Sequence, residues 1–110
     1  MSMKSPIRPD RIRSIPEQFS WVDHRLVRDH HIEQLSHEAA ALYLFLVTVA
    51  DSQGMSYYSD ASLQQRLALY EQSLAAARSC LARTGLALYR KPLYQLLPLG
   101  DSPVAIGGGR

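Results

Sequence analysis

Hydrophobic and polar residues follow a helical spacing through the first half of the chain, after a proline-rich start. Ser20 and Asp23 have the spacing of a capping box and predict a short helix with Val22 and Leu26 on one face. The stretch 39–50 is apolar around almost its whole circumference, so we expect it to be the central buried helix. Ser36 is positioned to cap this helix, and a polar cluster of turn-forming residues ends it. The pattern therefore predicts two helices before any strand.

A short strand and a third helix are predicted after that turn. Residues 55–57 have the pattern of a very short extended segment. Ser59 or Asp60 would cap the next helix, because their side-chain oxygens accept hydrogen bonds from the first free backbone N–H groups. Leu63 and Leu67 lie four residues apart on this helix and would face the core together.

The fourth helix is predicted over 71–83, after a tight passage through 68–70. Gly85 is placed to end it, because glycine readily adopts the left-handed conformation found after helix C-termini. Two strand-like runs, 86–89 and 93–97, are separated by Arg-Lys-Pro, which predicts a hairpin. The residues on the inner stripe of this fourth helix are Leu74, Ala77 and Leu81.

The predicted order is helix, helix, short strand, helix, tight turn, helix and hairpin, which places a three-stranded sheet beside three helices. Over residues 20–97 this order resembles the winged helix-turn-helix family, a mainly α fold with a small β-sheet that combines three to four helices with a β-hairpin wing. Segment 63–74 carries the main resemblance, with Ala68 starting the turn and Leu69 plugging it from within. The stretch 81–86 is similar to the Leu-x-x-x-Gly-Leu ending that leads into the wing of many bacterial regulators and replication initiators.

The resemblance implies that the chain binds duplex DNA through the second helix of the helix-turn-helix, since the major groove, about 12 Å wide, admits one helix. Arg90 and Lys91 would lie at the wing tip, against backbone phosphates. Arg8, Arg11 and Arg13 would enter an adjacent minor groove, as basic arms do in other DNA-binding folds. The helix residues expected to face the major groove are Gln72, Ser73, Ala76, Ser79 and Arg83.

Charge and composition divide the 110 residues into an extended basic arm (1–16), one folded domain (17–99) and a flexible tail (100–110). The net charge is only +2, but the basic residues gather toward both ends and leave a neutral to acidic middle. An apolar fraction of 46% and a charged fraction of 20% are ordinary for a globular domain, so disorder is not expected. The lone Cys80 fits a reducing compartment, and we expect a cytoplasmic protein, associated with the nucleoid if it binds DNA, without a signal peptide or membrane partner.

The sequence provides little for catalysis, cofactors or metals. Motifs of phosphate-binding loops, nucleophile elbows and zinc proteases are missing, so we expect neither an enzyme nor a cofactor. His24, His30, His31 and His37 lack the paired spacing of a zinc site, and Cys80 has no cysteine partner, so we expect no bound metal.

Two aromatic pairs each have two interpretations. Phe19 and Trp21 would anchor the first helix on the central helix or, if exposed, mark a partner surface such as that of a homodimer. Tyr57 and Tyr58 could contact nucleic acid, but packing at the sheet is favoured, with one ring inward and the other half-exposed.

Two functions remain open. The first is a duplex DNA-binding protein, either a transcriptional regulator or a regulator or initiator of a bacterial plasmid or mobile element, acting as a dimer. The second is a winged-helix protein–protein interaction module, such as an assembly adaptor. Glu71, the alanine run 75–77 and the modest net charge favour the second. Tyr70 and Arg78 also depart from the family pattern, in which a Ser or Asp cap and a core leucine are usual.

Overall fold

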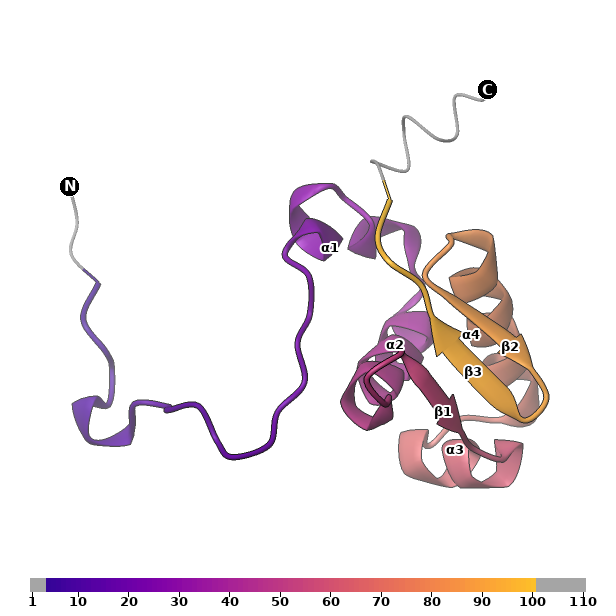
Figure 1. Cartoon of the computed structure of the whole chain (residues 1–110), viewed down its shortest axis with the longest axis horizontal. Helices are drawn as coiled ribbons and strands as arrows, with labels where there is room; N and C mark the ends of the chain where they lie inside the picture. The colour runs from indigo at the N-terminus through magenta and orange to yellow at the C-terminus, as the bar shows by residue number, and fades with distance from the viewer. Residues whose placement is uncertain (1–3, 101–110) are drawn as a thin grey trace.

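The structure is a computed structural model that describes residues 4–100 (Figure 1). Within these residues, four α-helices and a small three-stranded antiparallel sheet form an α+β arrangement, as the residue pattern predicts at this coarse level. Two single turns of 3₁₀ helix, Pro9–Arg11 and Ile32–Gln34, precede the larger elements. The elements are α1 (Arg25–Arg28), α2 (His37–Val49), β1 (Met55–Tyr57), α3 (Asp60–Leu67), α4 (Glu71–Arg83), β2 (Ala87–Arg90) and β3 (Leu93–Leu96).

Serine side chains fix the starts of two of the helices. The Ser36 hydroxyl accepts a hydrogen bond from the backbone N–H of Ala39 at 3.1 Å, which opens α2. Ser59 does the same for α3 by accepting from the N–H of Ser62 at 3.1 Å. Both predicted serine caps are therefore confirmed, and at α3 the cap is Ser59 and not Asp60.

The connection from α3 to α4 and the end of α4 are both set by left-handed residues. Ala68 has φ of 55° and ends α3, so the chain turns sharply before α4 begins. Gly85 has φ of 77° and donates to the carbonyl of Ala82, while Leu86 donates to the carbonyl of Leu81. This pair of bonds is a Schellman motif, and it satisfies carbonyls that the end of a helix leaves unpaired.

The sheet has the strand order β1-β3-β2, so the last strand lies between the other two. Ser56 pairs with Tyr94, and Tyr94 also pairs with Tyr89, so these three side chains share one face of the sheet. That face lies against the helices, because Tyr94 and Ser56 are buried and Tyr89 packs against the core. The predicted hairpin is confirmed, although β2 lies one residue later than predicted and β3 ends one residue earlier.

The core lies between α2 and α4, which pack against each other, with the sheet at their side. The exposed fraction of Leu42, Leu46 and Leu74 is 1% or less. Helix α2 is nevertheless not buried all round as predicted, because Leu44 on its outer side is 64% exposed. Burial of this helix is thus limited to the side that its neighbours cover.

The first helix differs from the prediction. It begins at Arg25 and not directly after Ser20, whose hydroxyl donates instead to the carbonyl of Thr48 at 3.2 Å. The Asp23 carboxylate accepts from the backbone N–H of Arg25 at 2.9 Å and so directs the chain into the helix two residues later. Leu26 is buried, but Val22 lies before the helix and is 43% exposed, so the two do not share a helix face as predicted.

The N-terminal segment leaves the folded body as an extended chain (Figure 1). Phe19 and Trp21 are 67% and 77% exposed, so the prediction that they anchor the first helix on α2 is wrong. Every helix within residues 4–100 is too short or too polar to cross a membrane. The predicted tail, apart from Gly100, lies outside the described residues.

Candidate nucleic-acid interface

Helix α4 presents a polar stripe on the side away from the core. Gln72, Ala76, Ser79 and Arg83 are exposed and follow each other at intervals of three or four residues, which places them on one side of the helix. Ser73 is half-buried beside them. Four of the five residues of this helix that the sequence predicted to face a groove therefore share one exposed side, and Ser73 lies at its edge.

The β2–β3 hairpin runs back along α4. Because Gly85 reverses the chain, β2 lies antiparallel to the helix, and the ring of Tyr89 meets the side chain of Arg78 in the middle of α4. The hairpin turn with Arg90 and Lys91 consequently lies level with the first half of α4. Figure 1 shows this turn at the end of the molecule that also holds α3. Both cations are exposed there.

Arg78 holds α3, α4 and the hairpin together. Its Nη1 donates to Asp60 Oδ1 at 2.8 Å and to the Tyr94 hydroxyl at 2.7 Å, and its Nη2 donates to Asp60 Oδ2 at 3.3 Å. The guanidinium carbon also lies 4.2 Å from the centre of the Tyr89 ring, within the range of a cation–π contact. Arg78 therefore belongs to a polar link between elements and does not occupy the open surface.

The tyrosine of this link remains a neutral hydroxyl. Burial raises the pKa of the Tyr94 phenol, and the hydrogen bond from Arg78 offsets only part of that effect. Tyr94 also packs on Tyr89, with ring centres 4.5 Å apart. The sequence pattern singled out Arg78 only as a departure from a usual leucine. Its partner Asp60 is 18 residues away, so local spacing does not reveal the pair.

Charge differs sharply between the two parts of the folded body. Residues 55–96 contain five basic and two acidic side chains, whereas residues 17–54 contain six acidic and two basic ones. In the first of these parts, Arg78 is paired with Asp60. The remaining cations of that part are all exposed and form no salt bridge with other residues that the structure describes; they are Arg66, Arg83, Arg90 and Lys91.

The arm arginines lie apart from this surface. In Figure 1 the arm leaves the body on the side opposite the hairpin. Arg8 forms a bidentate ion pair with Asp10, with the shortest contact at 2.7 Å. The hydrogen bonding to Asp10 raises the pKa of the Arg8 guanidinium. Arg11 and Arg13 are exposed. The single chain therefore packs the hairpin along α4, through Arg78, but does not bring the arm to either of them.

The remaining candidates provide no reactive cluster among the described residues. No group of three or more histidine, cysteine or carboxylate side chains within 4–100 is arranged to hold a metal ion. Cys80 is buried, and its thiol lies 3.6 Å from the carbonyl of Gln34 as a donor. His31 is 3% exposed, and neither ring nitrogen has a hydrogen-bond partner within the described chain.

The chain was compared with models of known protein families, with curated proteins and with solved structures, and none of them matches it.

Proposed function

We propose that this chain is a winged helix-turn-helix protein that binds duplex DNA, as a transcriptional regulator or as a regulator or initiator of a plasmid or mobile element. Three features of the backbone support the fold assignment. Helices α2, α3 and α4 and the strands follow each other in the winged-helix order. Ala68 makes the tight turn between α3 and α4, and the hairpin strand β3 joins β1 to complete the sheet.

The observation that carries the DNA-binding proposal is the set of exposed cations on α3, α4 and the hairpin that form no salt bridge within residues 4–100. Arg66 lies on α3, Arg83 ends α4, and Arg90 and Lys91 lie at the hairpin turn. The outer stripe of α4 is narrow, because Ala76 and Ser79 are small. A narrow helix can approach the floor of the major groove while flanking cations neutralise phosphates. Affinity would come mainly from these backbone contacts.

Sequence readout is expected to be modest. Gln72 is the one residue of the stripe with an amide side chain, and it would form bidentate hydrogen bonds with an adenine edge. Glu71 suits the positive end of the helix dipole but repels nearby phosphates. Ala75 and Ala76 offer only methyl groups, which can contact a thymine methyl but cannot hydrogen-bond.

The proposal is tested by the salt dependence of binding, measured as fluorescence anisotropy of a labelled duplex of mixed sequence. Four phosphate contacts predict a slope of log Kobs against log salt of about −3.6, or about 150-fold weaker binding between about 50 and 200 mM salt. The double variant Arg90→Ala/Lys91→Ala should lower the magnitude of the slope by about two. The control Arg28→Ala removes an exposed cation of α1 in the acidic part and should leave the slope unchanged. Binding that does not change with salt would contradict the proposal.

A protein-binding role is the second candidate, and one observation favours it. Tyr70 is 81% exposed immediately before α4, and exposed tyrosines are enriched at protein–protein interfaces. Charge reversal discriminates the two functions. Arg90→Glu/Lys91→Glu should weaken duplex binding by about tenfold or more if the surface holds phosphates, and should change nothing in function if it holds a protein through Tyr70.

A further inference from the structure

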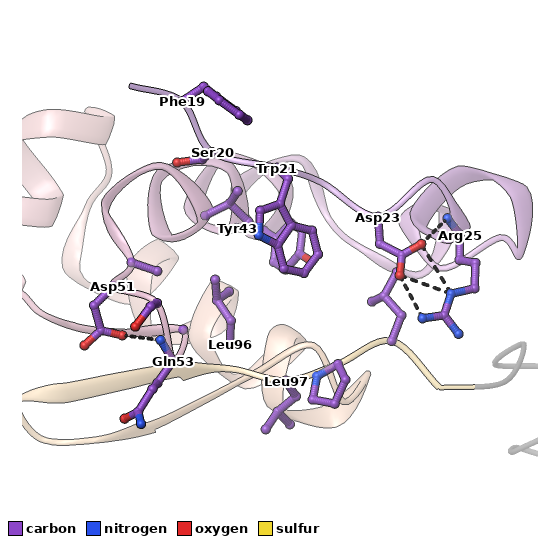
Figure 2. A pocket seen from close by; sticks show the side chains of 16 residues that line it. Phe19, Ser20, Trp21, Asp23, Arg25, Tyr43, Asp51, Gln53, Leu96 and Leu97 are labelled. Carbon is purple, nitrogen blue, oxygen red and sulfur yellow. Dashed lines mark hydrogen bonds and ion pairs between the residues drawn. The ribbon is translucent and has the colours of Figure 1, made fainter. Parts of the chain in front are cut away.

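A groove of about 580 Å³ opens at the base of the N-terminal arm. Figure 2 shows the segment with Phe19 and Trp21 along one rim and the end of β3, with Leu96 and Leu97, along the opposite rim. The Trp21 ring points into the hollow beside Tyr43 of α2. Aromatic and aliphatic side chains thus form the apolar part of a concave surface that also carries polar and charged residues, and its size is one that usually holds a ligand or peptide segment.

The arm that starts at this groove exposes several isoleucines. Ile7, Ile12 and Ile15 are 97%, 67% and 80% exposed. Serine or lysine at these three positions would cost the fold nothing, because the isoleucine side chains are not part of its core. Ile12 and Ile15 lie in one short stretch that continues into Pro16. Single exposed apolar residues are ordinary, but two isoleucines exposed on an extended segment can pack against an apolar groove wall on a second copy.

We propose that segment 12–16 of a second copy of this chain occupies the groove, with Ile12 and Ile15 packed against Trp21, Tyr43 and Leu97. The exchange is reciprocal, so each copy gives its arm and receives its partner's arm. Such an arrangement has two-fold symmetry and closes as a dimer. It deepens the dimer expected from the sequence and does not depend on DNA binding.

Charge complementarity supports this occupant over an uncharged ligand. The arm carries Lys4, Arg8, Arg11 and Arg13 against Asp10 as its one acidic residue up to position 16, whereas the groove lies in the acidic part of the body. Two carboxylates, Asp23 and Asp51, and one cation, Arg25, line the groove, and Arg25 is already paired with Asp23. Asp51 is therefore the carboxylate that would attract the arm arginines that flank the isoleucines.

These two carboxylates are held in place and charged. Hydrogen bonds from Arg25 lower the pKa of Asp23 to about 2, so its charge persists at neutral pH. Asp51 Oδ1 accepts from the backbone N–H groups of Gln53 and Met55, both at 2.9 Å, which fixes the carboxylate at the rim. Asp51 forms no salt bridge with any residue in 4–100, so it can receive an incoming arginine.

The occupant is a second chain because the geometry disfavours the chain's own arm. Ile15 is only four residues from Phe19, which itself forms the rim. Pro16 fixes its own φ and restricts the residue before it to extended conformations. Reversing the chain into its own groove would need a tight turn in this short stretch, whereas the extended arm can reach a neighbour directly (Figure 1).

The test is the oligomeric state of the full chain without DNA, by sedimentation velocity over a range of concentrations. The unmodified chain should reach twice the mass of one chain, and Ile12→Glu/Ile15→Glu should remain at the mass of one chain. Both isoleucines are exposed in the single chain, so this variant should keep its melting temperature at low concentration. Leu44→Glu is the matched control, because it changes a similarly exposed apolar residue on α2 and should still dimerise.

The fluorescence of Trp21 provides a second readout, since it is the one tryptophan of the sequence. Its emission should shift to the blue as concentration rises and the partner's arm covers it, and this shift should be missing in Ile12→Glu/Ile15→Glu. In addition, mixing Ile15→Cys chains with Gln53→Cys chains and adding a mild oxidant, such as oxidised glutathione, should give a disulfide between the two different chains.

Four results would overturn the proposal. A chain that stays monomeric with exposed Trp21 at all concentrations excludes any occupant from the chain itself. A monomer with blue-shifted Trp21 shows that the chain's own arm fills the groove. A dimer that survives Ile12→Glu/Ile15→Glu, or that only Leu44→Glu disrupts, has its interface elsewhere. All four are read without DNA, so they are separate from a failure of duplex binding.

Discussion

Helices α2 and α4 have the same length, 13 residues, and pack on each other, yet they expose different chemistry. Helix α2 contains no lysine or arginine, and its outer side shows Leu44 and Thr48. Helix α4 uses smaller residues in the core, such as Ala77 and Cys80, and presents a polar stripe outward that ends in Arg83.

The difference separates the residues that hold the fold from those that the proposed function assigns to DNA binding. The inner sides of α2 and α4 have the same character, because both contribute buried leucines to one hydrophobic core. The outer sides do not, since the cations near α4 are unpaired within the described chain while α2 belongs to the acidic part of the body. Substitutions on the inner sides should therefore change stability, and those on the outer side of α4 should change binding.

The largest effect is expected where the two helices meet. Leu46→Ala and Leu74→Ala each remove a side chain that is 1% exposed or less, and each should lower the free energy of unfolding by about 3 kcal/mol. Urea unfolding followed by circular dichroism measures the loss. Leu44→Ala, on the open side of α2, should cost less than about 0.5 kcal/mol. Equal losses at Leu44 and Leu46 would contradict the assignment of inner and outer sides.

A smaller effect is expected at the link between α3, α4 and the hairpin. Arg78→Ala should cost about 1–2 kcal/mol of unfolding free energy, because the Arg78 side chain is 17% exposed but Asp60 is 42% exposed and remains partly solvated. A double-mutant cycle with Asp60→Ala isolates the pair, with a coupling of about 1 kcal/mol expected. Strict additivity of the two variants would show that the ion pair contributes nothing beyond packing.

The smallest effects are expected at the helix starts, where α2 is capped by Ser36 and the side chain of Tyr70 makes no capping bond for α4 among the described residues. Ser36→Ala should lower the free energy of unfolding by about 1 kcal/mol. Tyr70→Ser should raise it by about 0.5–1 kcal/mol, since the exposed ring gives little burial and serine supplies the missing acceptor. A loss of stability in Tyr70→Ser would indicate that the ring makes contacts that its exposure does not suggest.

Sequence spacing predicted those parts of the fold that local chemistry decides. The bounds of β1 and α4 agree with the prediction residue for residue, because a turn precedes β1 and a Schellman glycine, Gly85, follows α4. The outward stripe of α4 follows from the same periodicity that places Leu74 and Leu81 in the core.

The features that sequence spacing missed all depend on contacts between distant segments. Ser20 had the pattern of a cap, but its hydroxyl bonds to Thr48, 28 residues away. In the sequence Arg78 stands where the family pattern has a core leucine. In the structure it donates hydrogen bonds to Asp60 and Tyr94. The groove is formed by three stretches of chain that meet only in the folded structure, so no local pattern could reveal it.

The most direct test of the central claim is a map of backbone amide shifts by two-dimensional NMR as duplex DNA is added. The proposal predicts that the largest shifts fall on Gln72 and Ser79 of α4 and on Arg90 and Lys91 of the hairpin, while Leu44 on α2 stays unchanged. Shifts centred on α2 and the acidic part of the body, or no shifts at duplex concentrations that saturate anisotropy, would contradict it.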